Sequence, residues 1–451
     1  MNFVIVNIIL IVVVLFQGKE SFLNEMWVFY TIHYITLFLH IFFQINKKCN
    51  YLFIAFSPIV LSFIYTGVFF TLGSYVIPRG YGFFLIPYET FPEIDNLNYY
   101  TIYLFVTNIL ILFFWNFLIN KKVKTIEKKL NAQEWMSFKY SNFIFFCILF
   151  LLLSFTKLSF LGSISGVFLY PFKFITIIGL VLVSISLSIR KKIALYVLLM
   201  ILVSIYHYHS KREIILVLFA IIFLEFLYNK LKLKLSFKTF SIMLILAGVM
   251  CYSILAASIL RGYGGYKLNN KFEAFLKVPD YIQKDYFLDV AVANFEINYM
   301  FGNTILCMNL VENGKLPLQY GSSYFKFLFS PIPRSIWKNK PDGIILKYSY
   351  ALDPNYKKIG QSMPVVHYGE GFVNFYWLGF IVATLIIVVF EYLYWCIIET
   401  NWKSIFNWKF VFFIYINCII FQYIRGSGFD LFMLYVTASL PMILFIKLLK
   451  R

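Results

Sequence analysis

The sequence predicts an all-α fold, a polytopic membrane protein that forms a single integral membrane domain over residues 1–451. Hydrophobic residues make up 61% of the chain and charged residues only 14%, whereas soluble domains carry about 25% charged residues. The apolar residues also gather in long runs. This composition excludes a disordered chain, and cysteines scattered mostly within apolar runs exclude a disulfide-rich secreted scaffold.

Twelve apolar stretches come close to the length of about 20 residues that crosses a bilayer. They cover residues 2–17, 26–44, 51–72, 99–120, 141–160, 165–189, 193–209, 213–229, 238–260, 371–398, 409–424 and 429–448. The first stretch lacks the basic start and the small-residue cleavage site of a signal peptide, so we expect an uncleaved helix there. The sequence therefore predicts about twelve transmembrane helices.

The distribution of lysine and arginine predicts which side of the membrane each connection faces. The net charge is +19, and most lysines lie in alternate connections, such as 121–139 and 230–238. Because short cytoplasmic loops are rich in these residues, we expect these connections and both termini to be cytoplasmic. Residues 73–98 and 261–370 then form outer loops, and the second is long enough to contain short helices. Basic residues placed between apolar runs also argue against a nucleic-acid partner.

Acidic residues are few, and they give little sign of transport. Secondary transporters typically have ionisable residues within their spans and an internal repeat. Here the predicted spans contain few ionisable residues, and the chain shows no internal repeat. In the larger outer loop, Asp285, Asp289 and Glu296 recur at helical spacing. We interpret these three residues as one solvated helix face.

Several arginines lie at the predicted outer face, although the chain uses lysine for most of its cytoplasmic positive charge, and four of them are candidate phosphate ligands. They are Arg212, Arg261, Arg334 and Arg425. Guanidinium groups pair with phosphate oxygens through two parallel hydrogen bonds. We therefore interpret the four arginines, with Lys211 and Lys338, as candidate ligands of a diphosphate at the outer membrane–water boundary. The simpler alternative for any one of them is a side chain that reaches lipid head groups.

His367 and Glu370 lie where the large outer loop enters a predicted span. A histidine and a glutamate at this spacing can provide general-base catalysis, particularly if they share a helical turn. The alternatives are a loop histidine without a function and an acidic residue that the helix dipole favours in a first turn. No cluster has the spacing of a metal site and no nucleotide-binding motif occurs, so the sequence predicts neither metal nor cofactor. The one alternative is a divalent cation held by Glu93 and Asp95 in the other outer loop.

Two groups of motifs make the chain resemble the Wzy-type O-antigen polymerases, also called oligosaccharide repeat unit polymerases. The first group is Tyr320-Gly321-Ser322-Ser323-Tyr324, followed by Pro333-Arg334-Ser335-Ile336-Trp337 and Lys340-Pro341. The second is Gly369-Glu370-Gly371-Phe372 with Asn374, Phe375 and Gly379. Lys211-Arg212 at the start of a span, the late Arg425-Gly426 and the single large outer loop extend the resemblance over nearly the whole chain.

The resemblance implies a fold like that of the membrane-embedded C-type glycosyltransferases. It implies a polymerase that joins undecaprenyl-diphosphate-linked oligosaccharides into a surface polysaccharide, of the O-antigen or capsule type, at the outer leaflet of the bacterial cytoplasmic (inner) membrane. Its partners would be these lipid-linked oligosaccharides, membrane lipids and a chain-length regulator protein. The arginines would stabilise the departing lipid diphosphate, and His367 or Glu370 would accept the proton of the attacking hydroxyl.

Two other functions remain open. An O-antigen ligase uses the same donor with a different acceptor, but the Pro333–Trp337 stretch favours the polymerase. A polysaccharide flippase or other transporter is the second alternative, and the absence of paired halves argues against it.

Overall fold

The computed structural model describes residues 3–45, 54–80, 91, 93–130, 148–149, 163–184, 187–206, 211–228, 237–262, 265–329, 332, 336–356, 362–399 and 408–449. Among these residues the secondary structure is helical, apart from one isolated β-bridge between Val365 and Ser427. The all-α prediction is therefore confirmed. The chain divides into two compact units, which we call unit 1 and unit 2. Unit 1 is 1–132, 296–401 and 420–434, and unit 2 is 133–295, 402–419 and 435–451.

Several described helices have the length and the composition of membrane spans. Four are long and apolar enough to cross a membrane: Lys19–Phe43, Pro58–Arg79, Leu97–Phe117 and His367–Ile398. Shorter apolar helices are Phe3–Phe16, Pro171–Leu182, Ile214–Glu225, Ala247–Leu260, Val411–Ile424 and Phe429–Leu440. These helices indicate a multi-pass membrane protein. Of the twelve predicted spans, 141–160 lies outside the described residues except for Ile148 and Leu149, and each of the others overlaps a helix.

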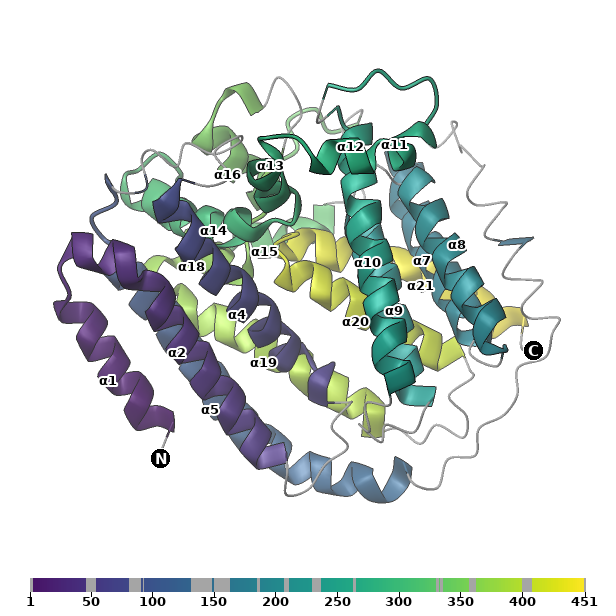
Figure 1. Cartoon of the computed structure of the whole chain (residues 1–451). Helices are drawn as coiled ribbons and strands as arrows, with labels where there is room; N and C mark the ends of the chain where they lie inside the picture. The colour runs from purple at the N-terminus through teal and green to yellow at the C-terminus, as the bar shows by residue number, and fades with distance from the viewer. Residues whose placement is uncertain are drawn as a thin grey trace. The chain divides into compact units, whose positions relative to one another are not determined.

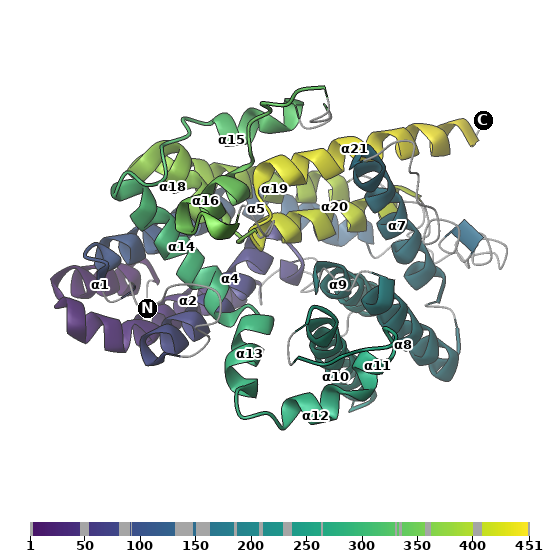
Figure 2. The same ribbon diagram turned by 90° about the horizontal axis from the view of Figure 1, so that it is seen from above.

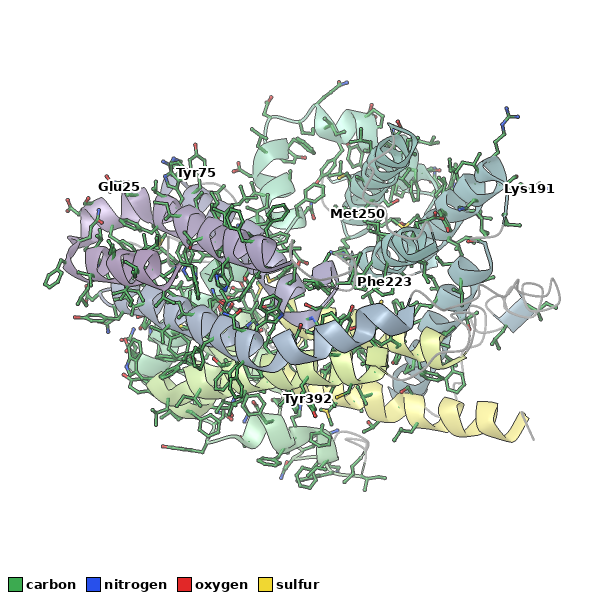
Figure 3. All side chains as sticks on the ribbon, turned by 90° about the horizontal axis from the view of Figure 1, so that it is seen from below. Glu25, Tyr75, Lys191, Phe223, Met250 and Tyr392 are labelled. Carbon is green, nitrogen blue, oxygen red and sulfur yellow. The ribbon has the colours of Figure 1, made fainter. Side chains whose placement is uncertain are left out.

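Large apolar side chains remain exposed along α19 (Gly379–Glu399), the helix that carries the Tyr392 labelled in Figure 3. Ile381, Leu385, Val389 and Tyr392 are 44–51% exposed and follow one another at intervals of three or four residues. That spacing places them on one face of the helix. A continuous apolar face is unusual on a soluble monomer, and lipid would cover it in a membrane.

Unit 1 is built mainly from helices of the N-terminal third and from α14 to α19 (Figure 1). Its first helices are α1 (Phe3–Phe16), α2 (Lys19–Ile45), α4 (Pro58–Val76), the 3-10 turn η1 (Ile77–Arg79) and α5 (Leu97–Leu130). The helix α4 packs against α2 and against α14 (Ile297–Glu312), whereas α5 packs against α19. A Cβ atom on Gly73 would lie 2.7 Å from Phe301 Cβ, so glycine permits the close approach of α4 and α14.

A chain of hydrogen bonds crosses the buried interior of unit 1. His33 Nδ1 lies 2.6 Å from Asn7 Oδ1, and Asn108 Nδ2 donates to His33 Nε2 at 3.1 Å. The hydroxyl of Tyr368 donates to Asn108 Oδ1 at 2.5 Å. His33 is therefore a satisfied core residue, because both of its ring nitrogens have partners.

The predicted span 371–398 lies within the apolar segment His367–Ile398, and the helix is interrupted inside this segment. It consists of α18 (His367–Phe375), the 3-10 turn η5 (Tyr376–Leu378) and α19. A Cβ atom on Gly379 would lie only 2.2 Å from the carbonyl oxygen of Gly371, so the two glycines allow the backbones of α18 and α19 to touch. Tyr376 in the turn has φ +55°, a conformation that non-glycine residues seldom adopt.

Unit 2 contains the helices of the central part of the chain. They are α7 (Ser163–Ser184), α8 (Ile189–Tyr206), α9 (Lys211–Tyr228), α10 (Phe237–Leu260), α11 (Glu273–Leu276), α12 (Val278–Ile282) and α13 (Phe287–Asn294). Figure 2 shows α11, α12 and α13 beside α10, where Ile259, Phe275 and Tyr281 share a buried core. On α8 and α9, Lys192 and Glu225 form an ion pair of 2.9 Å. The helices α20 (Trp408–Ile424) and α21 (Phe429–Leu449) contribute residues to both units.

Candidate functional site

Glu370 connects three segments of unit 1 that are far apart in the sequence. Its carboxylate is fully buried on α18. Ser323 Oγ, on the one-turn helix α15 (Ser322–Phe325), donates to Glu370 Oε1 at 3.0 Å. The backbone N–H of Phe429, the first residue of α21, donates to Glu370 Oε2 at 3.0 Å. Both carboxylate oxygens therefore accept a hydrogen bond from another segment.

Asn374 joins the same segments one turn further along α18. Its Nδ2 donates to Ser323 Oγ at 2.8 Å, and its Oδ1 accepts from the N–H of Gly321 at 3.0 Å. Gly321 has φ +83°, which favours glycine at this position. These bonds hold the Tyr320–Tyr324 motif against the Gly369–Phe375 motif, a contact between the two motifs that the sequence does not predict.

Arg425 and Gly426 form the connection between α20 and α21, beside the same group. Gly426 has φ +101°, and its carbonyl oxygen accepts from the N–H of Val365 at 3.1 Å. Arg425 Nε donates to Glu296 Oε2 at 2.8 Å, and a second guanidinium nitrogen bonds the other oxygen. The interpretation of Glu296 as part of a solvated helix face is therefore wrong, because its side chain is only 17% exposed and pairs with Arg425.

Glu370 has a structural counterpart in Glu391 on α19. Glu391 is also buried, and its Oε2 accepts from the backbone N–H of Ile59 in the first turn of α4 at 2.9 Å. Trp395 Nε1 donates to its other oxygen at 2.7 Å. A carboxylate at a helix N-terminus satisfies free N–H groups and is favoured by the helix dipole. Glu370 thus has at least one evident role, which is to cap α21.

His367 differs from both carboxylates and from His33. It begins α18, so His367 and Glu370 share a helical turn, as the sequence predicts. Its side chain is fully buried, yet within the described residues neither ring nitrogen has a hydrogen-bond partner. Its ring lies 3.9 Å from the ring of Tyr368, centroid to centroid. Among the hydrogen bonds of the described residues, none joins His367 to Glu370. A buried polar group without a partner requires an explanation.

Two tyrosine hydroxyls lie near Glu370 in the same buried region. Tyr324 and Tyr423 are buried, and within the described part of the chain their hydroxyl groups have no hydrogen-bond partner. Burial raises the pKa of Tyr324 well above 10.0, and the nearby Tyr423 and Glu370 raise it further. A neutral tyrosine keeps its proton available for donation to a ligand.

Two lysines lie on the predicted outer-loop side of this cluster, and sequence reasoning did not single them out. Lys326, at the start of the 3-10 turn η4 (Lys326–Phe329), pairs with Asp430 of α21 at 2.8 Å. Lys347, on α16 (Ile344–Leu352), donates to Gln319 Oε1. Partial burial and the neighbouring Lys326 lower the pKa of Lys347 from its usual 10.5.

The structure describes the sequence-predicted cationic residues only in part. Arg425 belongs to unit 1, and the half-buried Arg261 belongs to unit 2. Lys211 and Arg212 begin α9, but their side chains and the whole of Arg334 lie outside the described residues. Lys338 is exposed. A shared site for the four arginines therefore stays a prediction.

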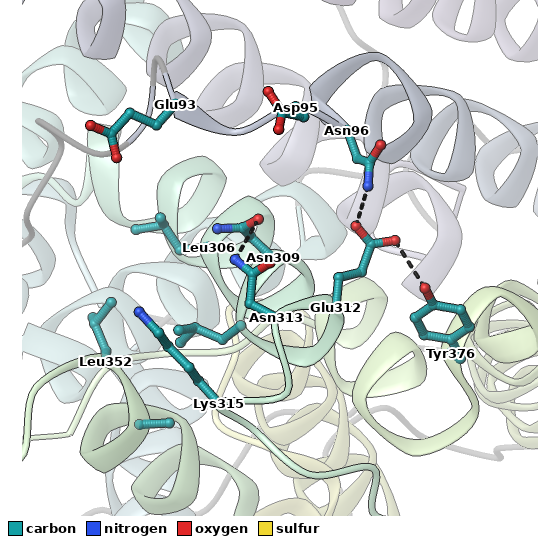
Figure 4. A pocket seen from close by; sticks show the side chains of 12 residues that line it. Glu93, Asp95, Asn96, Leu306, Asn309, Glu312, Asn313, Lys315, Leu352 and Tyr376 are labelled. Carbon is teal, nitrogen blue, oxygen red and sulfur yellow. Dashed lines mark hydrogen bonds between the residues drawn. The ribbon is translucent and has the colours of Figure 1, made fainter.

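A polar pocket of about 590 Å³ opens elsewhere in unit 1 (Figure 4). It is lined by Glu93, Asp95, Asn96, Leu306, Asn309, Leu310, Glu312, Asn313, Lys315, Ala351, Leu352 and Tyr376. Glu312, the last residue of α14, accepts from Asn96 Nδ2 at 2.5 Å and from the Tyr376 hydroxyl at 3.1 Å. Sequence reasoning missed this pocket because no local motif connects residues 93–96 with the end of α14.

The described residues contain no group of three or more histidine, cysteine, aspartate or glutamate side chains arranged to bind a metal ion. No protein-family model, curated protein or solved structure matches this chain. Unit 1 thus contains three features that could carry a function: the buried cluster around Glu370, the His367 ring without a hydrogen-bond partner among the described residues, and the polar pocket.

Proposed function

We propose that this chain is a membrane glycosyltransferase that polymerises undecaprenyl-diphosphate-linked oligosaccharide repeat units. It would act at the outer leaflet of the bacterial cytoplasmic membrane, with both termini in the cytoplasm. The observation that carries the proposal is the hydrogen-bonded cluster around Glu370. Three groups of this cluster come from the segments that carry the resemblance to the polymerases. Ser323 and Asn374 lie within two of these segments, and the backbone N–H of Phe429 follows the third, Arg425-Gly426.

The leaving group of this reaction is a lipid diphosphate, which needs cations on the outer side of the membrane. In unit 1, Lys326 and Lys347 lie close enough for Lys326 to lower the pKa of Lys347. We assign Lys347 to the diphosphate together with the predicted Arg212, Arg261 and Arg334, whereas Lys326 is paired with Asp430. Arg425 has a different role in this proposal, because Glu296 already occupies its guanidinium fork.

The attacking sugar hydroxyl must lose its proton as the new bond forms, and a positioned base contributes roughly 10²–10⁴-fold to such a step. Glu370 uses both oxygens to hold Ser323 and α21. His367 has two ring nitrogens without a partner among the described residues. We therefore assign His367 as the base and Glu370 as a positioning residue. Because His367 is fully buried, the acceptor reaches it only after the covering residues move.

The proposal is tested by deleting the gene in its host and separating the surface polysaccharide on a gel. Loss of a polymerase leaves single repeat units on the acceptor, whereas loss of a ligase removes all attached polymer. Loss of a flippase leaves lipid-linked units on the cytoplasmic side. Complementation with the unaltered chain should restore long polymer, and complementation with Ser323→Ala should restore shorter chains or none. The matched control is Ser241→Ala on α10 of unit 2, which we expect to restore normal length.

A further inference from the structure

The pocket in Figure 4 combines an apolar floor with polar walls. Leu306 and Leu310 are buried at its base, whereas Glu93, Asp95 and Lys315 at its rim are exposed. Its volume of about 590 Å³ falls within the range of roughly 300–1,000 Å³ that small-molecule sites occupy. The pocket is therefore large enough for more than a single small ring, and it is open for a ligand to enter.

The wall residues suit a ligand that has many hydroxyl groups. Asn309 and Asn313 lie side by side, with Asn313 Nδ2 donating to Asn309 Oδ1 at 3.3 Å. Amide side chains both donate and accept, and a carboxylate has about four acceptor positions, of which Asn96, Tyr100 and Tyr376 use three at Glu312. Tyr376 is 37% exposed and offers part of a ring surface at the pocket wall. Neighbouring sugar hydroxyls need paired donors and acceptors, and the sugar ring itself can pack on an aromatic face.

Tyr376 is also held in a costly conformation. Its φ of +55° belongs to a region that costs roughly 1–3 kcal/mol for a residue other than glycine. The hydroxyl bond to Glu312 and ring contacts with Phe372 and Trp377, with centroids 5.1 and 5.8 Å away, keep it in place. Backbone strain that the surroundings maintain is concentrated at ligand-binding sites.

The charge of the pocket opposes that of the whole chain. Glu93, Asp95 and Glu312 contribute three carboxylates to its lining, against the single ammonium of Lys315. The chain as a whole carries a net charge of +19. Lys19 pairs with Asp95 at 2.8 Å, which reduces but does not reverse the acidic character. An anionic group in this pocket would be repelled by carboxylates, whereas an amino group would be attracted.

We infer that this pocket binds the sugar part of an oligosaccharide, at sugar residues that are neutral or carry a free amino group, and that it disfavours sugars with carboxylates. This inference rests on the proposed function, and it adds where the sugars bind and which charge they carry. The pocket would hold the oligosaccharide by its sugars, and the anionic diphosphate would bind at cationic residues elsewhere in the chain.

The test uses the full chain purified in detergent and three soluble probes of equal length. They are triacetylchitotriose, which is neutral, the glucosamine trimer, which is cationic, and trigalacturonic acid, which is anionic. Isothermal titration calorimetry should show binding of the first two and at least tenfold weaker binding of the third. Glu312→Gln should weaken binding of the glucosamine trimer about tenfold or more, because a hydrogen bond to a charged group is worth roughly 1.5–3 kcal/mol.

Glu312 also bonds Asn96 and Tyr376, so a second variant guards against a folding defect. Lys315→Glu changes an exposed residue and should increase the preference for the cationic over the anionic trimer. Asp280→Asn on α12 of unit 2 is the matched acid-to-amide control and should bind as the unaltered chain does. Equal binding of the neutral and anionic trimers, unchanged binding in both pocket variants, or no binding of any trimer at millimolar concentration would overturn the inference.

The outcomes separate the pocket from the proposed function. If the chain forms polymer from lipid-linked repeat units but binds none of the three trimers, the inference about the pocket is wrong and the proposed polymerase function is retained. Trimer binding with the expected charge preference, in a chain that never forms polymer, would remove the polymerase and leave a sugar-binding pocket.

Discussion

Replacing Arg425 with lysine should lower the free energy of unfolding by about 1.5–3 kcal/mol. In the native structure the guanidinium makes two hydrogen bonds to the two oxygens of Glu296, and the side chains are only 14% and 17% exposed. A lysine ammonium cannot make both bonds in this forked geometry. The loss of one hydrogen bond to a charged group costs roughly 1.5–3 kcal/mol. Arg425→Ala leaves the carboxylate without its guanidinium and should cost more, about 3–5 kcal/mol.

The assay is chemical denaturation of the purified chain in detergent, followed by tryptophan fluorescence. Glu296→Ala should cost as much as Arg425→Ala or less, and the double variant should cost clearly less than the sum, with a coupling of about 1–3 kcal/mol. Asp285→Ala, an exposed acidic residue of the same loop, is the control and should change stability by less than about 0.5 kcal/mol.

The reasoning would be refuted if Arg425→Lys were as stable as the unaltered chain while Glu296→Gln bound inorganic pyrophosphate more tightly. That combination would mean that Arg425 serves a ligand rather than Glu296. It would restore Arg425 to the diphosphate site that the sequence predicts.

Three further predictions concern residues of the core and the outer region. His367→Leu should leave the melting temperature unchanged or raise it, because neither ring nitrogen has a partner among the described residues, and it should abolish polymer formation. His33→Leu should lower the melting temperature, because it leaves the groups of Asn7 and Asn108 that bond the ring unpaired, at roughly 1–3 kcal/mol each. A His367→Leu chain with full activity would eliminate the proposed base. Gly379→Ala should destabilise by about 3 kcal/mol or more in denaturation, since its Cβ would meet backbone at 2.2 Å, whereas Gly248→Ala in open space within α10 should stabilise by roughly 0.5–1 kcal/mol. The pKa of Lys347 is lowered in the folded chain, so unfolding takes up a proton at pH values between that lowered pKa and 10.5. The free energy of unfolding should therefore rise with pH across this window, compared with that of Lys347→Gln. Parallel pH profiles of the two proteins would contradict this prediction.

The helices could be predicted from the sequence because hydropathy is a local property. Runs such as 238–260 and 429–448 match α10 and α21 within a few residues. The break at Tyr376 could not be predicted in this way, because its cause is the contact of Gly371 with Gly379 and the backbone conformation of a tyrosine. Hydropathy averages across such a turn and reports one continuous span.

Some members of the candidate site could be predicted from the sequence, but its bonds could not. The motifs pointed to Glu370 and to Ser323, yet the sequence gives no reason for the N–H of Phe429, 59 residues away, to meet that carboxylate. Glu296 was assigned to solvent because its spacing from Asp289 is helical, whereas α13 in fact ends at Asn294 and Glu296 precedes a new helix. Pairings at long range depend on how helices pack, which side-chain spacing within one helix does not encode.

The helix α14 has a mechanical consequence for the two regions at its ends. It spans 16 residues, or about 24 Å at 1.5 Å per residue. Glu296 precedes the first residue of the helix and accepts hydrogen bonds from Arg425. Glu312 is the last residue of the helix and accepts hydrogen bonds from Asn96 and Tyr376. Phe301 near its first turns bears on Gly73 of α4 without room for one further carbon atom. A helix held in this way moves as a rod, so a displacement imposed at the pocket would be transmitted along its axis to the Arg425 connection rather than absorbed between them.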